Sequence, residues 1–237
     1  MLDPSRIRAI TLDLDDTLWP VWPTIRRANQ AMRDWLAPHA PQAAALAGNA
    51  EIVTSAREAV ASTQPDIAHD LGATRREVIR HLLRQAGEDT ALAEPAFEVF
   101  HDARQRVSLF DDALPALEFL AARYPLVALS NGNADIQRVG LGHLFQAAIS
   151  ATSAGVAKPD PRIFRAGADA ARVPADRVLH IGDDAHLDVA GALAIGMQAA
   201  WVNRTDMPWP AAAPQPQATV RYLMQLCRLL EGHSTGA

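Results

Sequence analysis

The stretch that decides the fold is AITLDLDDTLWP, residues 9–20. Its first four residues, Ala9 to Leu12, form a short apolar run that is typical of a buried β-strand. Three aspartates follow almost at once: Asp13, Asp15 and Asp16. Because alternate residues of a strand point the same way, we expect Asp13 and Asp15 to face one pocket and Asp16 the other side. Two like charges this close repel unless a cation or a shared proton relieves them, which predicts a chemically active strand end.

Further apolar runs along the chain predict more strands, and helical patterns separate the last three. Alternating strands and helices are typical of a parallel sheet that is covered on both faces. We therefore predict an α/β fold with a doubly wound parallel sheet. The predicted strands are residues 8–13, 126–130, 178–182 and 198–202, with a weaker one at 147–151.

The segment 22–106 contains no convincing strand and predicts an inserted all-helical domain. Its helices are expected after Thr24, after a capping box formed by Thr74 and Glu77, and over 95–106. The core domain is then discontinuous, built from residues 1–21 and 107–237. An insertion after the first strand is expected over the carboxyl ends of the strands, where open α/β sheets bind ligands.

Helix start signals and prolines organise the rest of the chain. Asp111 or Asp112 is expected to cap a helix, and Asp160 before Pro161 to start another. The stretch 207–218 contains four prolines and predicts an extended surface linker. A last amphipathic helix is expected over 220–230.

Bulk composition excludes several classes of protein. The formal net charge of −5 argues against a nucleic-acid binder, which usually has a basic excess. The single cysteine, Cys227, permits no intrachain disulfide. No apolar run reaches the length of a membrane span, so we expect a cytoplasmic protein without a membrane partner. We expect a monomer or a weak homodimer.

A second acidic cluster follows the strand expected at 178–182. It consists of Asp183, Asp184 and Asp188. Hard oxygen ligands beside other carboxylates suit Mg²⁺. The alternative is that Asp184 simply caps the following helix. Two acidic strand ends in one parallel sheet favour the metal-site interpretation.

Two smaller groups complete the candidate site. Ser130, Asn131 and Gly132 follow a predicted strand, where a hydroxyl and backbone N–H groups can hold a phosphoryl oxygen. Turn formation alone would select the same residue types. Lys158 precedes a helix start, where its amine can balance carboxylates and phosphate. The alternative for Lys158 is a solvated surface position.

In this order, the four groups resemble the motifs of the haloacid dehalogenase (HAD) superfamily, and the helical insertion resembles its C1-type cap. Within that superfamily, the chain more closely resembles the bacterial phosphatases that act on FMN and 5-amino-6-(5-phospho-D-ribitylamino)uracil. The stretches that carry this closer likeness are AITLDLDDTLWP, QPDIAHDL, PLVALSNGNADIQRVGLGHLF and HIGDDAHLDVAGALAIGMQAAWVNR. The resemblance implies a phosphatase that hydrolyses small phosphomonoesters.

The resemblance also implies the role of each residue. Asp13 is the nucleophile that forms an aspartyl-phosphate, and Asp15 protonates the leaving alcohol and then activates water. Lys158 stabilises charge during transfer and binds the phosphoryl group. The other phosphate-binding residues are Ser130, Asn131 and Gly132. The implied Mg²⁺ ligands and supports are Asp13, Asp15 through its backbone carbonyl, Asp183, Asp184 and Asp188.

Four alternative functions share the same fold. A dehalogenase needs no acid at position 15, since a halide leaves without a proton, so Asp15 favours phosphate chemistry. A phosphonate-cleaving enzyme would need a cap lysine, and residues 22–106 contain none. A phosphomutase and a non-catalytic binding module are the remaining alternatives.

Several aromatic and histidine residues are secondary candidates. An aromatic side chain among Trp19, Trp22 and Trp35 is expected to stack on a flavin-like ring, although Trp35 also fits a helical core. His69 and Asp70 are candidate substrate contacts or a surface turn. Two further histidines are interpreted as non-catalytic: His180 as a hydrogen-bonded core residue and His186 as a solvated one.

Overall fold

Six strands form one parallel sheet in the computed structural model of the chain, which describes residues 1–231. The strand order is β3-β2-β1-β4-β5-β6, so β1 lies between β2 and β4. All residues of β1, β2, β4 and β5 are buried, which explains why they read as apolar runs. This sheet confirms the predicted fold class. The strands are β1 (Ala9–Leu12), β2 (Leu126–Ser130), β3 (Ala147–Ser150), β4 (Val178–Gly182), β5 (Gln198–Val202) and β6 (Ala218–Val220).

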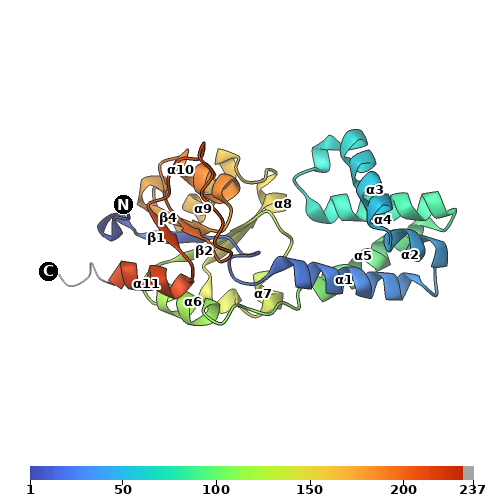
Figure 1. The fold of residues 1–237 in the computed structure, drawn as a ribbon, viewed down its shortest axis with the longest axis horizontal. Helices are drawn as coiled ribbons and strands as arrows, with labels where there is room; N and C mark the ends of the chain where they lie inside the picture. The colour runs from blue at the N-terminus through green and yellow to red at the C-terminus, as the bar shows by residue number, and fades with distance from the viewer. Residues whose placement is uncertain (232–237) are drawn as a thin grey trace. The chain divides into compact units, whose positions relative to one another are not determined.

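Helices cover both faces of the sheet (Figure 1). On one face, α9 (Pro161–Ala171) and α10 (Gly191–Leu193) pack on the strands, with Phe164 of α9 in the same apolar cluster as Val127 and Leu129. On the other face lie α6 (Ala113–Ala121) and α11 (Leu223–Glu231), which contact each other. Two apolar layers therefore bury the sheet, so the side chains that can reach a ligand lie at the strand ends.

Residues Val21–Val107 form a compact helical unit of their own, and the second unit comprises Met1–Pro20 and the chain from Ser108 onward. The helical unit has its own core, which includes Met32, Leu82 and Phe97. Its helices are α1 (Val21–Leu36), α2 (Pro41–Ala47), α3 (Ala50–Thr63), η2 (Pro65–Ile67), α4 (Leu71–Ala86), η3 (Thr90–Leu92) and α5 (Ala93–Arg104).

Several helices begin earlier than the sequence predicts. α1 starts at Val21, before the predicted Thr24. α4 starts at Leu71 because the side chain of Asp70 accepts a 2.9 Å hydrogen bond from the Ala73 backbone N–H. The predicted capping box at Thr74 is therefore wrong, and Asp70, a candidate substrate contact, serves as a helix cap.

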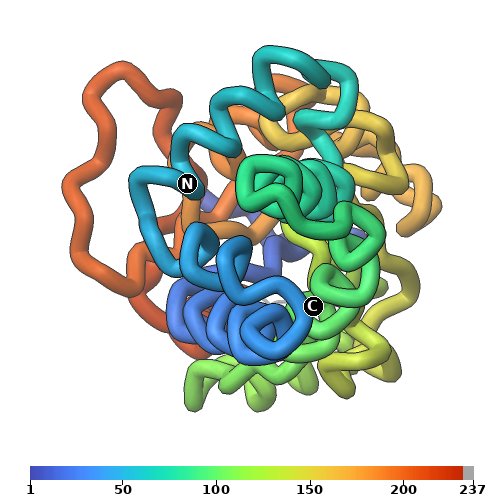
Figure 2. Tube along the Cα trace, turned by 90° about the vertical axis from the view of Figure 1, so that its right-hand side faces the viewer, coloured from blue at the N-terminus to red at the C-terminus, as the bar shows by residue number. Residues whose placement is uncertain are grey.

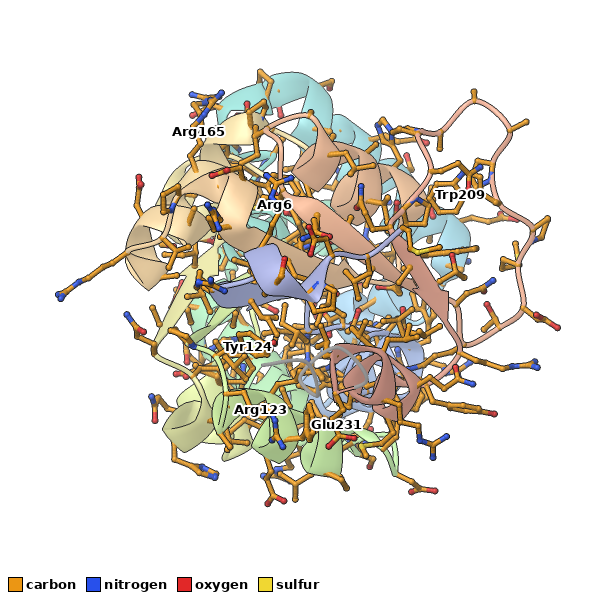
Figure 3. All side chains as sticks on the ribbon, turned by 90° about the vertical axis from the view of Figure 1, so that its left-hand side faces the viewer. Arg6, Arg123, Tyr124, Arg165, Trp209 and Glu231 are labelled. Atoms are coloured by element: carbon orange, nitrogen blue, oxygen red, sulfur yellow. The ribbon has the colours of Figure 1, made fainter. Side chains whose placement is uncertain are left out.

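The end of the chain contains a strand that the sequence analysis missed. Residues 203–217 form an extended loop, seen as the orange excursion in Figure 2, and Figure 3 shows Trp209 on it. β6 follows and pairs in parallel with β5. Because residues 218–220 are used in this pairing, α11 begins at Leu223 rather than at the predicted 220. Three residues are too few for a periodic signal.

Short helices connect the remaining elements. They are η1 (Pro4–Arg6), α7 (Ile136–Val139), η4 (Gly142–Leu144), α8 (Ala151–Ala154), η5 (Ala175–Arg177) and the π-helix η6 (Ala185–Ala190). Within residues 1–231, no helix is long and apolar enough to span a membrane.

Candidate active site

Asp13 stands directly after the central strand β1. Its backbone N–H donates a 2.9 Å hydrogen bond to the carbonyl oxygen of Ile181 in β4, which continues the pairing of the two strands. The residue is only 6% exposed. The strand pairing therefore fixes a buried carboxylate at the carboxyl edge of the sheet.

The loop after Asp13 leaves the strand, so strand alternation does not extend to the next aspartates. The carboxylate of Asp15 accepts a 2.7 Å hydrogen bond from the indole N–H of Trp19. Asp16 takes a left-handed backbone conformation with φ of 58°. Its negative charge also helps to raise the pKa of Asp183, so Asp16 contributes to the electrostatics of the site.

Lys158 is the cation of the cluster. Its Nζ lies 2.5 Å from Oδ1 of Asp13 and 2.6 Å from Oδ1 of Asp188, and the residue is 4% exposed. The side chain of Asn131 holds the Lys158 backbone at both polar groups: it accepts from the N–H at 2.7 Å and donates to the carbonyl at 3.1 Å. Asn131 therefore positions the lysine, which is a different contribution from the predicted phosphate binding.

Asp188 is fully engaged in hydrogen bonds. Its Oδ1 accepts from Lys158 and lies 3.1 Å from Nε2 of His180, and its Oδ2 accepts from the Asp184 N–H at 3.0 Å. On the other side of the histidine ring, Nδ1 lies 2.8 Å from the Thr11 hydroxyl. His180 is thus a hydrogen-bonded core histidine, as expected, and it connects the site to the interior of the sheet.

The second acidic cluster divides into different roles. Carboxylate oxygens of Asp13, Asp183 and Asp188 lie within 4.8 Å of one another. Asp184 does not join this group; its Oδ1 accepts from the backbone N–H groups of His186 and Leu187 at the start of η6. The helix-capping alternative therefore describes the Asp184 side chain.

Ser130 ends β2 and is 3% exposed. Its hydroxyl oxygen accepts a 2.9 Å hydrogen bond from the backbone N–H of Gly132, so that N–H is already used inside the loop. The hydroxyl proton of Ser130 is left to donate to an anion. Of the three residues predicted here, Ser130 keeps the clearest binding capacity.

The electrostatics of the site are dominated by burial and by like charges. Burial, together with Asp188 and Asp15, outweighs Lys158 and raises the pKa of Asp13 to about 7. Burial and the neighbouring carboxylates raise the pKa of Asp183 to about 8. For Lys158, burial opposes the charged form, but Asp13 and Asp188 outweigh it and raise the pKa above its usual range. One ammonium does not neutralise three carboxylates.

A divalent cation fits this donor set. Hard oxygen ligands are what Mg²⁺ prefers, and the raised carboxyl pKa values mark negative charge that the protein alone does not compensate. Thr17 is a further polar group here: its hydroxyl lies 3.4 Å from Oδ2 of Asp13 and 3.3 Å from Oδ1 of Asp183.

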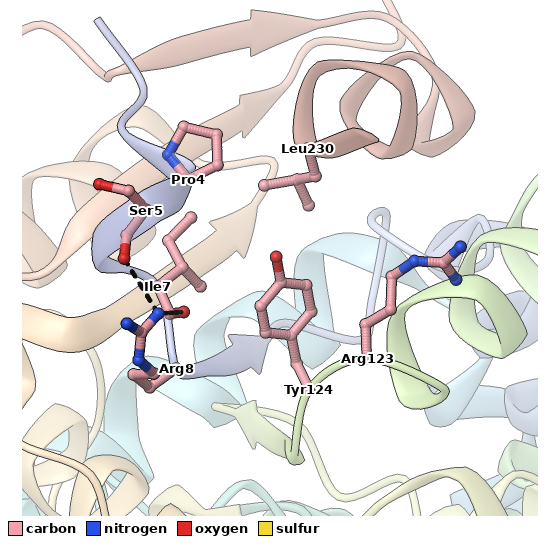
Figure 4. A pocket seen from close by; sticks show the side chains of 7 residues that line it. All are labelled: Pro4, Ser5, Ile7, Arg8, Arg123, Tyr124 and Leu230. Atoms are coloured by element: carbon pink, nitrogen blue, oxygen red, sulfur yellow. Dashed lines mark hydrogen bonds between the residues drawn. The ribbon is translucent and has the colours of Figure 1, made fainter. Parts of the chain in front are cut away.

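A cavity of about 340 Å³ elsewhere in the same unit does not belong to this site. It lies at the amino end of β1, where Ile7 and Arg8 precede the strand, and the Tyr124 side chain points into it (Figure 4). Figure 3 shows Tyr124 beside Arg123, whose Nη2 lies 3.8 Å from a carboxylate oxygen of Glu231. Its lining contains none of the predicted site residues.

The three tryptophans that were candidates for stacking on a ligand differ in their exposure to solvent. Trp19 is fully buried and its N–H is bound to Asp15, so the expectation that it stacks on a ligand ring is wrong. Trp35 stacks on His39 within the helical unit. Trp22 is 65% exposed and is the one of the three that is open to solvent.

Comparison with known proteins agrees with this geometry. A family model described as haloacid dehalogenase-like hydrolase matches residues 7–196. The chain is 34% identical to the 5-amino-6-(5-phospho-D-ribitylamino)uracil phosphatase YigB of Escherichia coli, over 84% of each chain. It is 31% identical to the phosphoserine phosphatase of Thermus thermophilus, over 88% of this chain and 94% of the relative.

Among solved structures, one similar to this chain is described as a 2-haloacid dehalogenase from Pseudomonas syringae. The two share 38% identity with a TM-score of 0.88, over 95% of this chain and 99% of the other. A HAD phosphatase from Thermococcus onnurineus shares the fold, with a TM-score of 0.69 at 23% identity over 95% and 99% of the two chains. The predicted enzyme class, a phosphatase-like hydrolase, is confirmed at this level. The chain belongs to the haloacid dehalogenase-like hydrolase family.

Proposed function

We propose that the chain hydrolyses small phosphomonoesters through a covalent intermediate on Asp13. One observation carries this proposal most: a buried carboxylate lies 2.5 Å from a buried ammonium, beside two further carboxylates. A carboxylate held in this way can attack phosphorus, while the surrounding cations reduce its repulsion from the phosphate.

The reaction has two balanced steps. First, a carboxylate oxygen of Asp13 bonds to phosphorus, the bond from phosphorus to the alcohol oxygen breaks, and Asp15 gives its proton to that oxygen. Then water bonds to phosphorus, Asp15 takes a proton from it, and the bond to Asp13 breaks to release phosphate. One residue serves as acid and then as base, as required when the leaving group and the water use the same side of phosphorus.

Lys158 and Ser130 hold the transferring group. The ammonium of Lys158 offsets the charge on the transferring oxygens, and the free hydroxyl proton of Ser130 donates to one of them. Asp188, through its contacts with Lys158, keeps the ammonium in place.

Mg²⁺ is the cofactor that the donor set suits. We propose that Asp13 and Asp183 hold it directly with the Asp15 carbonyl, and that Asp188 supports it through its hydrogen bonds. When bound, the ion neutralises charge on the phosphoryl oxygens. Asp184 contributes by shaping the start of η6, which carries Asp188.

The favoured substrates are phosphoesters of the flavin pathway, namely 5-amino-6-(5-phospho-D-ribitylamino)uracil and FMN. The likeness to YigB over 84% of the chain supports the first of these. A cytoplasmic location, action on small molecules without nucleic-acid or membrane partners, and a monomeric or weakly dimeric state remain predictions.

A panel of phosphomonoesters with and without Mg²⁺ tests this function. We expect Mg²⁺-dependent phosphate release and the highest kcat/KM on the ribityl phosphate or FMN. A clear preference for phosphoserine or for simple sugar phosphates would reject the flavin assignment but keep the phosphatase. The absence of turnover on every phosphomonoester would reject both.

A dehalogenase is the second candidate, because a similar solved structure carries that description. The site argues against it: halide departure requires no proton, yet Asp15 stands two residues after the nucleophile and is held by Trp19. Halide release from (S)-2-chloropropionate decides the matter. Release faster than any phosphate release would make dehalogenation the activity of this chain.

A further inference from the structure

Arg204 follows β5 and is hydrogen-bonded to the loop that begins at Asp13. Its Nε and Nη2 donate to the backbone carbonyl oxygen of Thr17, at 3.2 and 2.8 Å. Its Nη1 donates to Oδ1 of Asp112 at 2.9 Å, and the guanidinium lies over the Phe110 ring, 4.0 Å from its centroid. The side chain is 11% exposed. One arginine thus connects three separate segments.

The partners of Arg204 are themselves fixed. Oδ2 of Asp112 accepts a 2.6 Å hydrogen bond from the N–H of Leu223 at the start of α11. This contact explains why the Asp112 carboxylate does not cap α6 as predicted. The N–H of Phe110 donates to the carbonyl oxygen of Leu18 at 2.9 Å, the residue after Thr17. Arg204 therefore holds the loop against a rigid support.

The loop that begins at Asp13 combines an unusual backbone conformation with several residues of the site. It contains Asp16 in the left-handed region, with φ of 58°, a backbone conformation that residues with a Cβ rarely adopt. It also carries Asp15 and places the Thr17 hydroxyl between Asp13 and Asp183. A shift of the Thr17 carbonyl would move these groups together.

We propose that Arg204 is a positioning residue: by holding the Thr17 carbonyl, it keeps Asp15 within reach of the leaving-group oxygen. This inference rests on the proposed phosphatase function. Arg204 contacts no reacting atom. Its planar fork makes two bonds to one carbonyl and still pairs with Asp112, which a lysine cannot do.

The test compares two leaving groups in Arg204→Lys and Asp112→Asn. An alkyl phosphate needs a proton from Asp15, whereas the phenolate of p-nitrophenyl phosphate leaves without one. We expect kcat/KM for the alkyl phosphate to fall about 10- to 100-fold and that for p-nitrophenyl phosphate to fall no more than about threefold. The ratio of the two values is the readout, because kcat/KM includes the departure of the leaving group.

Arg6→Gln is the matched control, since Arg6 pairs with Asp176 at 3.4 Å in the same unit and contacts none of the loop. It should leave the ratio unchanged. Thermal unfolding of each variant shows whether it is folded at the assay temperature. If Arg204→Lys is unfolded there, Asp112→Asn still tests the same contact. Equal losses on both substrates would overturn the inference. A wild-type enzyme that hydrolyses neither ester would reject the proposed function instead.

Discussion

The indole Nε1 of Trp19 donates a 2.7 Å hydrogen bond to Oδ1 of Asp15. Trp19 is fully buried, so the residue that carries the proposed acid–base carboxylate is tied to a part of the protein that cannot move freely. Such a contact restricts the rotamers of Asp15 before substrate arrives, which is what a proton donor needs in order to meet a leaving-group oxygen.

Trp19→Phe should therefore reduce the turnover of alkyl phosphates by about tenfold, because Asp15 loses its orientation. Asp15→Asn should cost about 10² to 10⁴, since general acid–base catalysis is lost. In the double variant, Trp19→Phe should add almost nothing to the loss caused by Asp15→Asn. Steady-state kcat/KM for the four proteins measures this coupling. Fully additive losses would show that Trp19 acts elsewhere.

The stability of the metal-free protein should depend on the ionisation of Asp183. Its pKa is raised to about 8 in the folded chain from 3.8, so its stabilising contribution is complete below about pH 4 and is lost as the pH rises to about 8. Asp183→Asn should therefore gain in Tm relative to the wild type as the pH rises through this window. His180, whose pKa burial lowers, acts with the opposite sign but is present in both proteins.

Thermal unfolding in EDTA at several pH values from 4 to 8.5 measures this difference. A difference in Tm that stays constant with pH would mean that the Asp183 carboxyl titrates as it does in the unfolded chain.

Binding of Mg²⁺ should release protons. Ionised carboxylates are the ligands, and the pKa values of Asp13 and Asp183 are raised to about 7 and about 8. Affinity should rise with pH up to about 8 and then level off. Calorimetric titrations at pH 6.5, in two buffers with different ionisation enthalpies, should show net proton release. Equal heats in both buffers would contradict the raised pKa values.

Lys158→Met should destabilise the protein strongly at high pH. It leaves the carboxylates of Asp13 and Asp188 buried without their cation, a change that typically costs about 3–5 kcal/mol. At pH 5 the loss should be smaller, since Asp13 then binds a proton. Urea unfolding at pH 5 and pH 8.5 measures both values. The exposed pair of Arg162 and Asp160 supplies a control, because Arg162→Met should change the free energy of unfolding little.

Gly182→Ala should displace Asp188. A Cβ at position 182 would lie 2.3 Å from Cγ of Asp188, far inside van der Waals contact. The variant should therefore lose activity and bind Mg²⁺ more weakly. Gly155→Ala is a control with open space around its Cβ, although its positive φ costs some stability. Unchanged activity in Gly182→Ala would show that Asp188 need not sit where the structure has it.

The sequence predicted the buried strands well because apolar runs and their turn residues are local signals. It missed β6, whose three residues depend on pairing with β5. The start of α4 was predicted at Thr74 from the pattern of Thr74 and Glu77, whereas the capping residue is Asp70.

The four groups of site residues could be predicted from their order, from the strands that precede three of them and from the helix that follows Lys158. The contacts that arrange them could not. Arg204 lies 187 residues from Thr17, and no local pattern links the two positions. The same holds for Asn131 and Lys158, whose mutual hydrogen bonds arise from neighbouring segments of the folded sheet edge. Likewise, no sequence pattern predicts the hydrogen bond from the buried Trp19 N–H to Asp15.

The measurement that tests the central claim most directly is the location of a phosphoryl group on the chain. Wild type and Asp15→Asn are mixed with a phosphomonoester and Mg²⁺, quenched in acid after a short time, digested, and analysed by mass spectrometry. With p-nitrophenyl phosphate, whose leaving group needs no proton, Asp15→Asn slows only the hydrolysis of the intermediate. We predict phosphorylation of Asp13, at higher occupancy in Asp15→Asn, and none in Asp13→Asn. Phosphorylation of another residue, or phosphate release by Asp13→Asn at an appreciable rate, would contradict the account.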